Sequence, residues 1–257
     1  MSDATARFYL DGRVALVTGA GRGLGRSIAA AFAKAGAEAW LLARTAPEVE
    51  QAAEEIRASG GRATAVVCDV TDSRAVAHVI ESMPALDVLV NNAGTNFPEP
   101  FVDVSEEHLD RLLNLNVRAA FLVAQAGARR MLAAADRRAR GGAIVNMSSQ
   151  MGHVGAVNRS VYCLTKHAIE GLTKTMAIEL APHGIRVNSL APTFIETPLT
   201  APMFARPEFS KWAHERIPLG RLGTLDEVAA AALFLASPAA SLVTGTSLLV
   251  DGGWTAQ

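Results

Sequence analysis

Short apolar segments alternate along the chain with longer segments that are compatible with helix. The apolar segments predict buried strands at residues 14–17, 40–43, 63–68, 86–90, 143–147 and 185–190. Helices are expected at residues 26–35, 47–58, 105–130 and 162–180. Strands that alternate with helices favour a parallel sheet covered by helices on both faces. The predicted fold class is therefore α/β, with a doubly wound parallel sheet.

Local sequence signals add detail to the prediction for residues 105–142. Ser105, followed by Glu106 and Glu107, is a good N-cap with acidic residues in the first helical turn. Residues 133–142 combine arginines with paired glycines, and we interpret them as a solvated connection. No internal repeat or low-complexity linker divides the sequence.

Composition fits one domain spanning residues 1–257. Half of the 257 residues are hydrophobic and 19% are charged, which is enough to bury a large core. A net charge of −1 offers no general attraction to nucleic acid or to an anionic membrane. The polar N-terminus and the absence of a membrane-length apolar run lead us to expect a soluble, cytoplasmic protein. Cys68 and Cys163 lack the spacing of a zinc site, and we interpret both as packing residues.

A glycine-rich loop follows the first predicted strand. Residues 18–25 read Thr-Gly-Ala-Gly-Arg-Gly-Leu-Gly and lead directly into a helix. Glycines allow close approach to a pyrophosphate, and the free N–H groups of the following helix attract its charge. The glycine loop, as we call residues 18–25, therefore predicts a dinucleotide site.

A serine, a tyrosine and a lysine supply candidate acid/base chemistry. Tyr162 and Lys166 are four residues apart in a helical segment, so both side chains lie on one face. A cation about 4 Å away, at an effective dielectric constant of about 20, favours the phenolate by roughly 4 kcal/mol. We therefore expect the pKa of Tyr162 to lie near neutrality. Ser149 follows a buried strand, where open α/β sheets place ligands.

These motifs together resemble the short-chain dehydrogenase/reductase family. The resemblance rests on the glycine loop, Asn91-Asn92-Ala93-Gly94, Asn116, Ser149 and Tyr162-x-x-x-Lys166, in family order and with similar spacing. It covers nearly the whole chain. It implies a Rossmann-type fold, with a cofactor half at about 12–142, a catalytic and substrate half at about 143–257, and NAD(P)-linked interconversion of alcohols and ketones.

The resemblance also implies which residues bind the cofactor. They are Gly19, Arg22, Gly23, Leu24, Gly25, Arg44, Asp69, Val70, Asn92, Ala93, Gly94, Tyr162, Lys166, Ile195 and Thr197. NAD-preferring relatives carry an aspartate where this chain has Ala43, and Arg44 and Arg22 are suited to hold a 2′-phosphate instead. We therefore expect NADP, with NAD possible. Asp69 as a helix N-cap and Arg44 as an ordinary surface arginine remain alternatives.

In the family, the tyrosine exchanges a proton with substrate while hydride moves to or from the nicotinamide. Ser149 would hydrogen-bond the substrate oxygen, and Lys166 would hold the nicotinamide ribose and lower the tyrosine pKa. Asn116 resembles the asparagine that anchors a water linking the lysine to solvent; a buried residue that bends the helix is the alternative. No metal is expected, because the cofactor carries the hydride chemistry.

The substrate side of the site is less defined. Thr193 stands where the family usually has glycine, and residues 198–217 mix aromatic residues with prolines, as expected of a lid. Ser149, His153, Tyr162 and Phe194 are the predicted substrate residues. Core packing is the alternative for the aromatic residues.

The leading hypothesis is an NADP-preferring enzyme acting on a small polyol or sugar acid such as gluconate. A 3-oxoacyl thioester reductase is the alternative reaction. A dinucleotide-binding regulatory scaffold is the alternative without catalysis. The resemblance also leads us to expect a homotetramer that pairs the helices carrying Asn116 and Tyr162.

Overall fold

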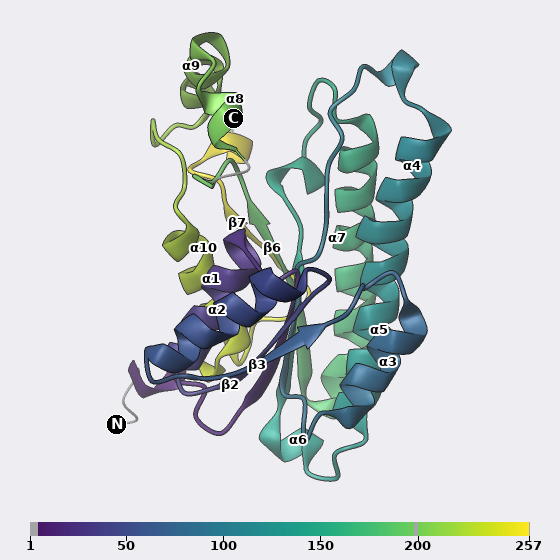
Figure 1. Ribbon diagram of the computed structural model, residues 1–257, viewed down its shortest axis with the longest axis vertical. Coiled ribbons are helices and arrows are strands. Elements are labelled where there is room, and N and C mark those ends of the chain that lie inside the picture. Colours follow the sequence, from purple (N-terminus) through teal and green to yellow (C-terminus); the bar gives the residue numbers. More distant parts are fainter. Residues whose placement is uncertain (1–4, 198–199, 257) are drawn as a thin grey trace.

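A parallel sheet lies between two layers of helices in the computed structural model, which describes residues 5–197 and 200–256 (Figure 1). Seven parallel strands of these residues form the sheet, in the order β3-β2-β1-β4-β5-β6-β7. The strands are β1 (Val14–Thr18), β2 (Glu38–Ala43), β3 (Arg62–Val67), β4 (Val88–Asn91), β5 (Gly142–Met147), β6 (Ile185–Pro192) and β7 (Ser247–Val250). The order reverses between β1 and β4, the switch point at which doubly wound sheets bind dinucleotides. The predicted Rossmann-type fold is confirmed.

Helices cover both faces of the sheet. They are α1 (Gly23–Lys34), α2 (Ala46–Ala58), α3 (Ser73–Ser82), α4 (Glu106–Leu113), α5 (Ala120–Leu132), α6 (Arg137–Arg140), α7 (Ser160–Leu180), α8 (Ala201–Phe204), α9 (Pro207–Arg216) and α10 (Leu225–Ala236). Figure 1 shows α1, α2 and α10 on one face and α3, α4, α5 and α7 on the other, with α8 and α9 above the sheet. None of the helices formed by the described residues has the length and apolarity needed to span a membrane.

Two hydrophobic cores hold the three layers together. Every residue of β1 and β4 is buried, because helices cover both sides of these central strands. One core includes Phe32 of α1 and Leu235 of α10, and the other includes Ile80 of α3 and Val123 of α5. The continuous apolar character of the strand sequences is a consequence of this two-sided burial.

Several elements escaped the sequence prediction. Strand β7 has only four residues and lies at an edge of the sheet, so its apolar segment is short. Helix α10 is apolar almost throughout and lacks a clear polar face. Its start did carry a signal, because Thr224 and Glu227 form a capping box. Helices α3, α8 and α9 were not predicted either.

The predicted helix at residues 105–130 is interrupted. Ser105 Oγ accepts a hydrogen bond from the backbone N–H of His108 at 3.2 Å, which confirms the N-cap. A π-helical segment, Asn114–Ala119, separates α4 from α5. Such wide turns are often found at functional sites, and this one contains Asn116.

The prediction of a solvated connection at residues 133–142 is correct for its exposed residues but not for its arginines at 137 and 140. The segment contains α6, and Arg137 is buried. Arg137 Nη1 lies 3.1 Å and Arg140 Nε 2.7 Å from Oδ1 of Asp87, a buried residue directly before β4. Burial raises the pKa of Asp87, but hydrogen bonds from Arg140, the backbone N–H of Val14 and Arg137 outweigh it and hold that pKa below its ordinary value. The arginines therefore serve as internal partners of a buried carboxylate.

Candidate active site

The glycine loop is closely packed at the carboxyl end of β1. Gly19 has a φ of +66°, in the left-handed region that favours glycine. A Cβ added to Gly25 would lie 2.4 Å from the carbonyl oxygen of Gly19, so a side chain there would clash with backbone. Arg22, the N-cap of α1, makes no side-chain capping hydrogen bond. The loop and the first turn of α1 thus fit an anionic pyrophosphate.

A threonine and an asparagine fasten this loop to the end of β4. Thr18 Oγ1 accepts hydrogen bonds from the backbone N–H groups of Asn92 at 2.9 Å and Ala93 at 3.0 Å. Asn92 Nδ2 donates to the carbonyl of Thr18 at 2.8 Å. Gly94 follows, and a Cβ there would come within 3.2 Å of Asn116 Oδ1. The two loops at the switch point therefore form one hydrogen-bonded unit. The part that Thr18 plays in it was missed from the sequence.

Two arginines lie at the predicted adenosine end of this unit. Arg44 is exposed directly after β2, and Arg22 Nε lies 4.0 Å from Glu48 Oε2. Arg22 is therefore within ion-pair distance of Glu48. No described acid lies within ion-pair distance of Arg44, although its charge contributes to lowering the pKa of Asp69.

Asp69 is exposed after β3 and does not cap a helix. Its Oδ1 accepts hydrogen bonds from the backbone N–H and the hydroxyl of Thr71, both at 2.8 Å. The backbone hydrogen bond is the main cause of its lowered pKa. Asp72 is the N-cap of α3, so the helix-cap alternative for Asp69 is wrong. Val70, next in the chain, is buried in the core.

Ser149 and Tyr162 meet at the carboxyl end of β5. Ser149 is buried directly after the strand, and its Oγ accepts the backbone N–H of Met151 at 3.2 Å. Tyr162 is half-buried in the first turn of α7. Burial raises the pKa of its phenol above the ordinary value, and a hydrogen bond with Ser149 acts in the opposite direction.

Lys166 lies one turn further along α7 and is buried. Its Nζ donates to the carbonyl of Met147 at 2.7 Å and lies 5.5 Å from the centre of the Tyr162 ring. Burial lowers the pKa of Lys166 to about 8, and the charge of Glu170 opposes that shift. The lysine would therefore lose its proton before the phenol ionises. The expected phenol pKa near neutrality is thus not found in this structure, because burial acts on both groups.

Glu170 is the centre of a buried polar network that sequence reasoning missed. Its carboxylate accepts hydrogen bonds from Ser189 Oγ at 2.6 Å and from Ser247 Oγ at 3.1 Å. His153 Nε2 lies 2.9 Å from Ser247 Oγ and 3.4 Å from Glu170 Oε1. The ring of His153, a predicted substrate residue, therefore contacts Ser247 of β7 and Glu170 of α7. The sequence did carry a signal for this network. Glu170 follows Lys166 by four residues, a spacing that places both side chains on one face of a helix.

Asn116 joins three parts of the site. Its Oδ1 accepts the backbone N–H of Thr95 at 2.9 Å, and its Nδ2 donates to the carbonyl of Thr95 at 2.8 Å and to Thr165 Oγ1 at 3.3 Å. Thr165 in turn donates to the carbonyl of Tyr162. The asparagine thus connects the loop after β4 to the helix that carries the tyrosine.

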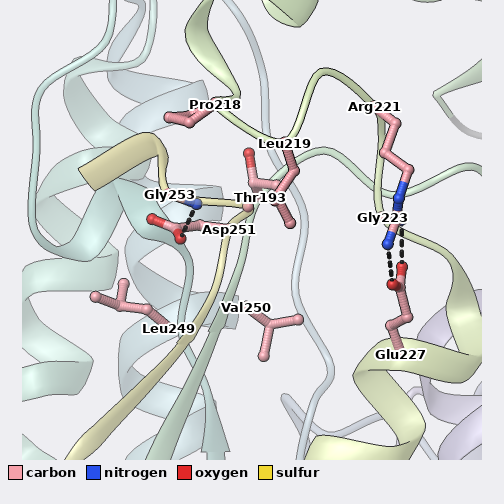
Figure 2. A pocket seen from close by; sticks show the side chains of 11 residues that line it. Thr193, Pro218, Leu219, Arg221, Gly223, Glu227, Leu249, Val250, Asp251 and Gly253 are labelled. Atoms are coloured by element: carbon pink, nitrogen blue, oxygen red, sulfur yellow. Dashed lines mark hydrogen bonds and ion pairs between the residues drawn. The ribbon is translucent and has the colours of Figure 1, made fainter. Parts of the chain in front are cut away.

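Thr193, the departure from the family pattern, faces a pocket of about 460 Å³ beside the end of β7. Figure 2 shows it near Leu219, Asp251 and Gly253, and Asp251 Oδ1 accepts the N–H of Gly253 at 3.0 Å. The backbone N–H of Thr193 donates to the carbonyl of Val250 at 3.1 Å. The extra side chain is therefore accommodated next to β7.

The segment after Thr193 leads into the predicted lid. Ile195 is buried, and Thr197 Oγ1 lies 3.0 Å from Thr200 Oγ1. Pro198 and Leu199 lie outside the described residues. Phe194 makes edge contacts, with ring centres 5.5–6.3 Å apart, with an aromatic cluster of Phe204, Phe209, Trp212 and Trp254. Phe194 thus connects β6 to the helices above the sheet and to the C-terminal segment.

Comparison with known proteins gives matches over nearly the full length. An L-xylulose reductase of Bos taurus is 42% identical over 247 residues, which cover 96% of this chain and 98% of that protein. A gluconate 5-dehydrogenase of Gluconobacter oxydans (strain 621H) is 40% identical, covering 96% of each chain. A crystal structure of a gluconate 5-dehydrogenase from Burkholderia cenocepacia J2315, in complex with NADP and tartrate, is 38% identical with a TM-score of 0.93, covering 99% of this chain and 100% of that one.

A family model described as enoyl-(acyl carrier protein) reductase matches residues 19–255. This match and the relatives agree with the geometry, which places the glycine loop, Ser149, Tyr162 and Lys166 at one edge of the sheet. The chain belongs to the short-chain dehydrogenase/reductase family of oxidoreductases that act on CH–OH groups.

Proposed function

We propose that this protein is an NADP-preferring oxidoreductase that interconverts a small polyol or sugar acid, such as gluconate, with its ketone. The observation that carries the proposal is the complete set of Ser149, Tyr162 and Lys166 beside a glycine loop that fits a pyrophosphate. L-xylulose reductase and gluconate 5-dehydrogenase relatives, and the tartrate in one related structure, support a small hydroxylated substrate.

Each residue of this set has a distinct part in the proposed reaction. Bound NADP supplies the hydride chemistry. The hydroxyl of Tyr162 takes the alcohol proton in oxidation and returns it in reduction. Ser149 Oγ holds the substrate oxygen, and Lys166 holds the nicotinamide ribose. Asn116 positions α7 through Thr165. In this proposal one domain contains a cofactor half at about residues 12–142 and a catalytic and substrate half at about residues 143–257.

A panel of substrates tests the proposal. Purified protein with NADPH is expected to reduce keto-gluconate or ketose substrates with a higher kcat/KM than acetoacetyl thioesters. The charges of residues 193–217 support this ranking, because Arg206, Lys211 and Arg216 are balanced by Glu196, Glu208 and Glu215, leaving no surplus of positive charge for an acidic carrier. A clear preference for the thioester would reverse the ranking. No turnover of any carbonyl substrate would favour the regulatory scaffold.

The cofactor preference rests on Arg44. The protein is expected to bind NADP(H) more tightly than NAD(H), because Ala43 leaves no carboxylate to repel a 2′-phosphate. Arg44→Ala removes charge-assisted hydrogen bonds of about 1.5–3 kcal/mol, so NADP(H) affinity should fall roughly ten- to a hundredfold with little change for NAD(H). Arg22→Ala should cost less, because Arg22 already pairs with Glu48. Fluorescence titration with each cofactor checks this, and equal affinity of the natural protein for both would contradict it.

We further propose a cytoplasmic homotetramer. Large apolar side chains are exposed on α5 and α7, including Phe121 at 47%, Leu164 at 54% and Ile178 at 78%. Such residues on neighbouring helices are typical of an association surface. Both cysteines are free thiols, which fits a reducing compartment.

A further inference from the structure

Arg159 occupies the loop between Ser149 and Tyr162. It is the last residue before α7, three positions ahead of Tyr162, and its side chain is half-buried. Its Nη1 donates to the carbonyl of Asn158 at 3.1 Å, and the same carbonyl accepts the backbone N–H of Glu99 at 3.1 Å. Asn158 has a φ of +60°, which fixes the direction of the chain at this point. Arg159 is therefore held beside the catalytic tyrosine and against the segment that follows β4.

The charge of Arg159 has no acidic partner among residues 5–197 and 200–256. Glu99, whose backbone lies nearby, has its carboxylate 2.6 Å from His108 Nδ1. Burial lowers the pKa of Arg159, while Tyr162 and Cys163 raise it, and no carboxylate contributes. Guanidinium stays protonated in proteins and carries five N–H donors, of which the Asn158 carbonyl takes one. A half-buried cation without a counter-ion is costly unless a ligand supplies the negative charge.

The other cations of the site are directed elsewhere. Lys166 Nζ is bonded to the carbonyl of Met147. Arg22 and Arg44 lie at the ends of β1 and β2, on the cofactor side. Among the described cations, Arg159 is the one whose charge favours ionisation of the Tyr162 phenol. A negative group on the substrate would therefore meet Arg159.

We infer that Arg159 binds the carboxylate of the substrate, so that this site selects hydroxy acids of the gluconate type over neutral polyols. The inference rests on the proposed function and makes its substrate class specific. A guanidinium and a carboxylate can form two parallel hydrogen bonds, which fix orientation as well as charge. With the carboxylate held at Arg159, a carbon further along the chain of the hydroxy acid would face Tyr162.

Two substrates that differ at one carbon test this. D-gluconate has a carboxylate where D-glucitol has a hydroxymethyl group. With NADP⁺, the natural protein should oxidise D-gluconate with a kcat/KM about ten- to a hundredfold higher, and Arg159→Gln should abolish the difference. The ratio cancels any effect of the variant on Tyr162, because both substrates use the same base. Arg159→Lys keeps the positive charge but loses the planar guanidinium that can form two parallel hydrogen bonds with a carboxylate. It should retain part of the preference for D-gluconate.

The control is Arg138→Gln, which removes an exposed arginine from α6, at the end of the sheet opposite the site, and should leave the ratio unchanged (Figure 1). Equal kcat/KM values for both substrates in the natural protein, or an equal loss for both in the Arg159 variants, would overturn the inference and leave the proposed function standing. If neither substrate is oxidised and an acetoacetyl thioester is reduced with NADPH, the proposed function fails, and this inference with it.

Discussion

Replacing Tyr162 with phenylalanine is expected to lower kcat by about 10²–10⁴ while leaving the fold and NADP(H) binding near native. The change removes only the hydroxyl, which hydrogen-bonds with Ser149 and, as we propose, exchanges the proton with the substrate. The ring, which lies 5.5 Å from Lys166 Nζ, is kept. Steady-state rates in both directions, with thermal unfolding and NADPH titration of the same preparation, separate lost chemistry from lost structure.

The chain offers a matched control for this variant. Tyr9 is exposed and lies before β1, so Tyr9→Phe makes the same chemical change away from the site and should leave kcat unchanged. Near-native turnover in Tyr162→Phe would contradict the mechanism. A large loss of NADPH affinity in that variant would instead show that the hydroxyl supports cofactor binding.

The sequence predicted the architecture because the physics of the central sheet is local and repetitive. Strands such as β1 and β4 are buried on both faces, so each reads as an apolar run between helical segments. The glycine loop was equally informative, since Gly25 tolerates no side chain against the Gly19 carbonyl. Edge strand β7 and apolar helix α10 gave weaker patterns, and both were missed.

Burial of charge could not be predicted from local sequence. Arginines at residues 137–140 predicted a solvated segment, yet two of them hold Asp87, which lies some fifty residues earlier. The same is true of Glu170, whose serine partners come from β6 and β7. These pairings depend on which strands become neighbours, and that is a property of the whole sheet.

In the active site, too, the positions of the side chains could be predicted from the sequence, but the direction of their pKa shifts could not. Helical spacing correctly put Tyr162 and Lys166 on one face of α7, one turn apart. Coulomb attraction alone then suggested a phenol pKa near neutrality. The structure adds desolvation, which raises the pKa of Tyr162 and lowers that of Lys166. Geometry was therefore predictable from spacing, whereas the electrostatic outcome required the burial of both groups.

Lys166→Ala is expected to lower turnover at least as much as Tyr162→Phe and, in addition, to weaken NADPH binding at pH 7. In the proposed complex the ammonium would hydrogen-bond the nicotinamide ribose, and losing charge-assisted contacts of about 1.5–3 kcal/mol would weaken binding roughly ten- to a hundredfold. Lys174→Ala is the control, because Lys174 is an exposed lysine on the same helix and should change neither quantity. NADPH titration and turnover with the best ketone measure both effects.

The pH dependence of this loss distinguishes the charge of Lys166 from its bulk. A lysine with a pKa of about 8 is mostly an ammonium at pH 7 and loses its proton as the pH rises above 8. The difference in NADPH affinity between the natural protein and Lys166→Ala should therefore be largest near pH 7 and shrink toward pH 9. The charge of Glu170 opposes the lowering of the Lys166 pKa. Glu170→Gln removes that charge, so the affinity difference should begin to shrink at a lower pH in that variant. A difference in affinity that stays constant from pH 7 to pH 9 would show that the charge of Lys166 contributes nothing to cofactor binding.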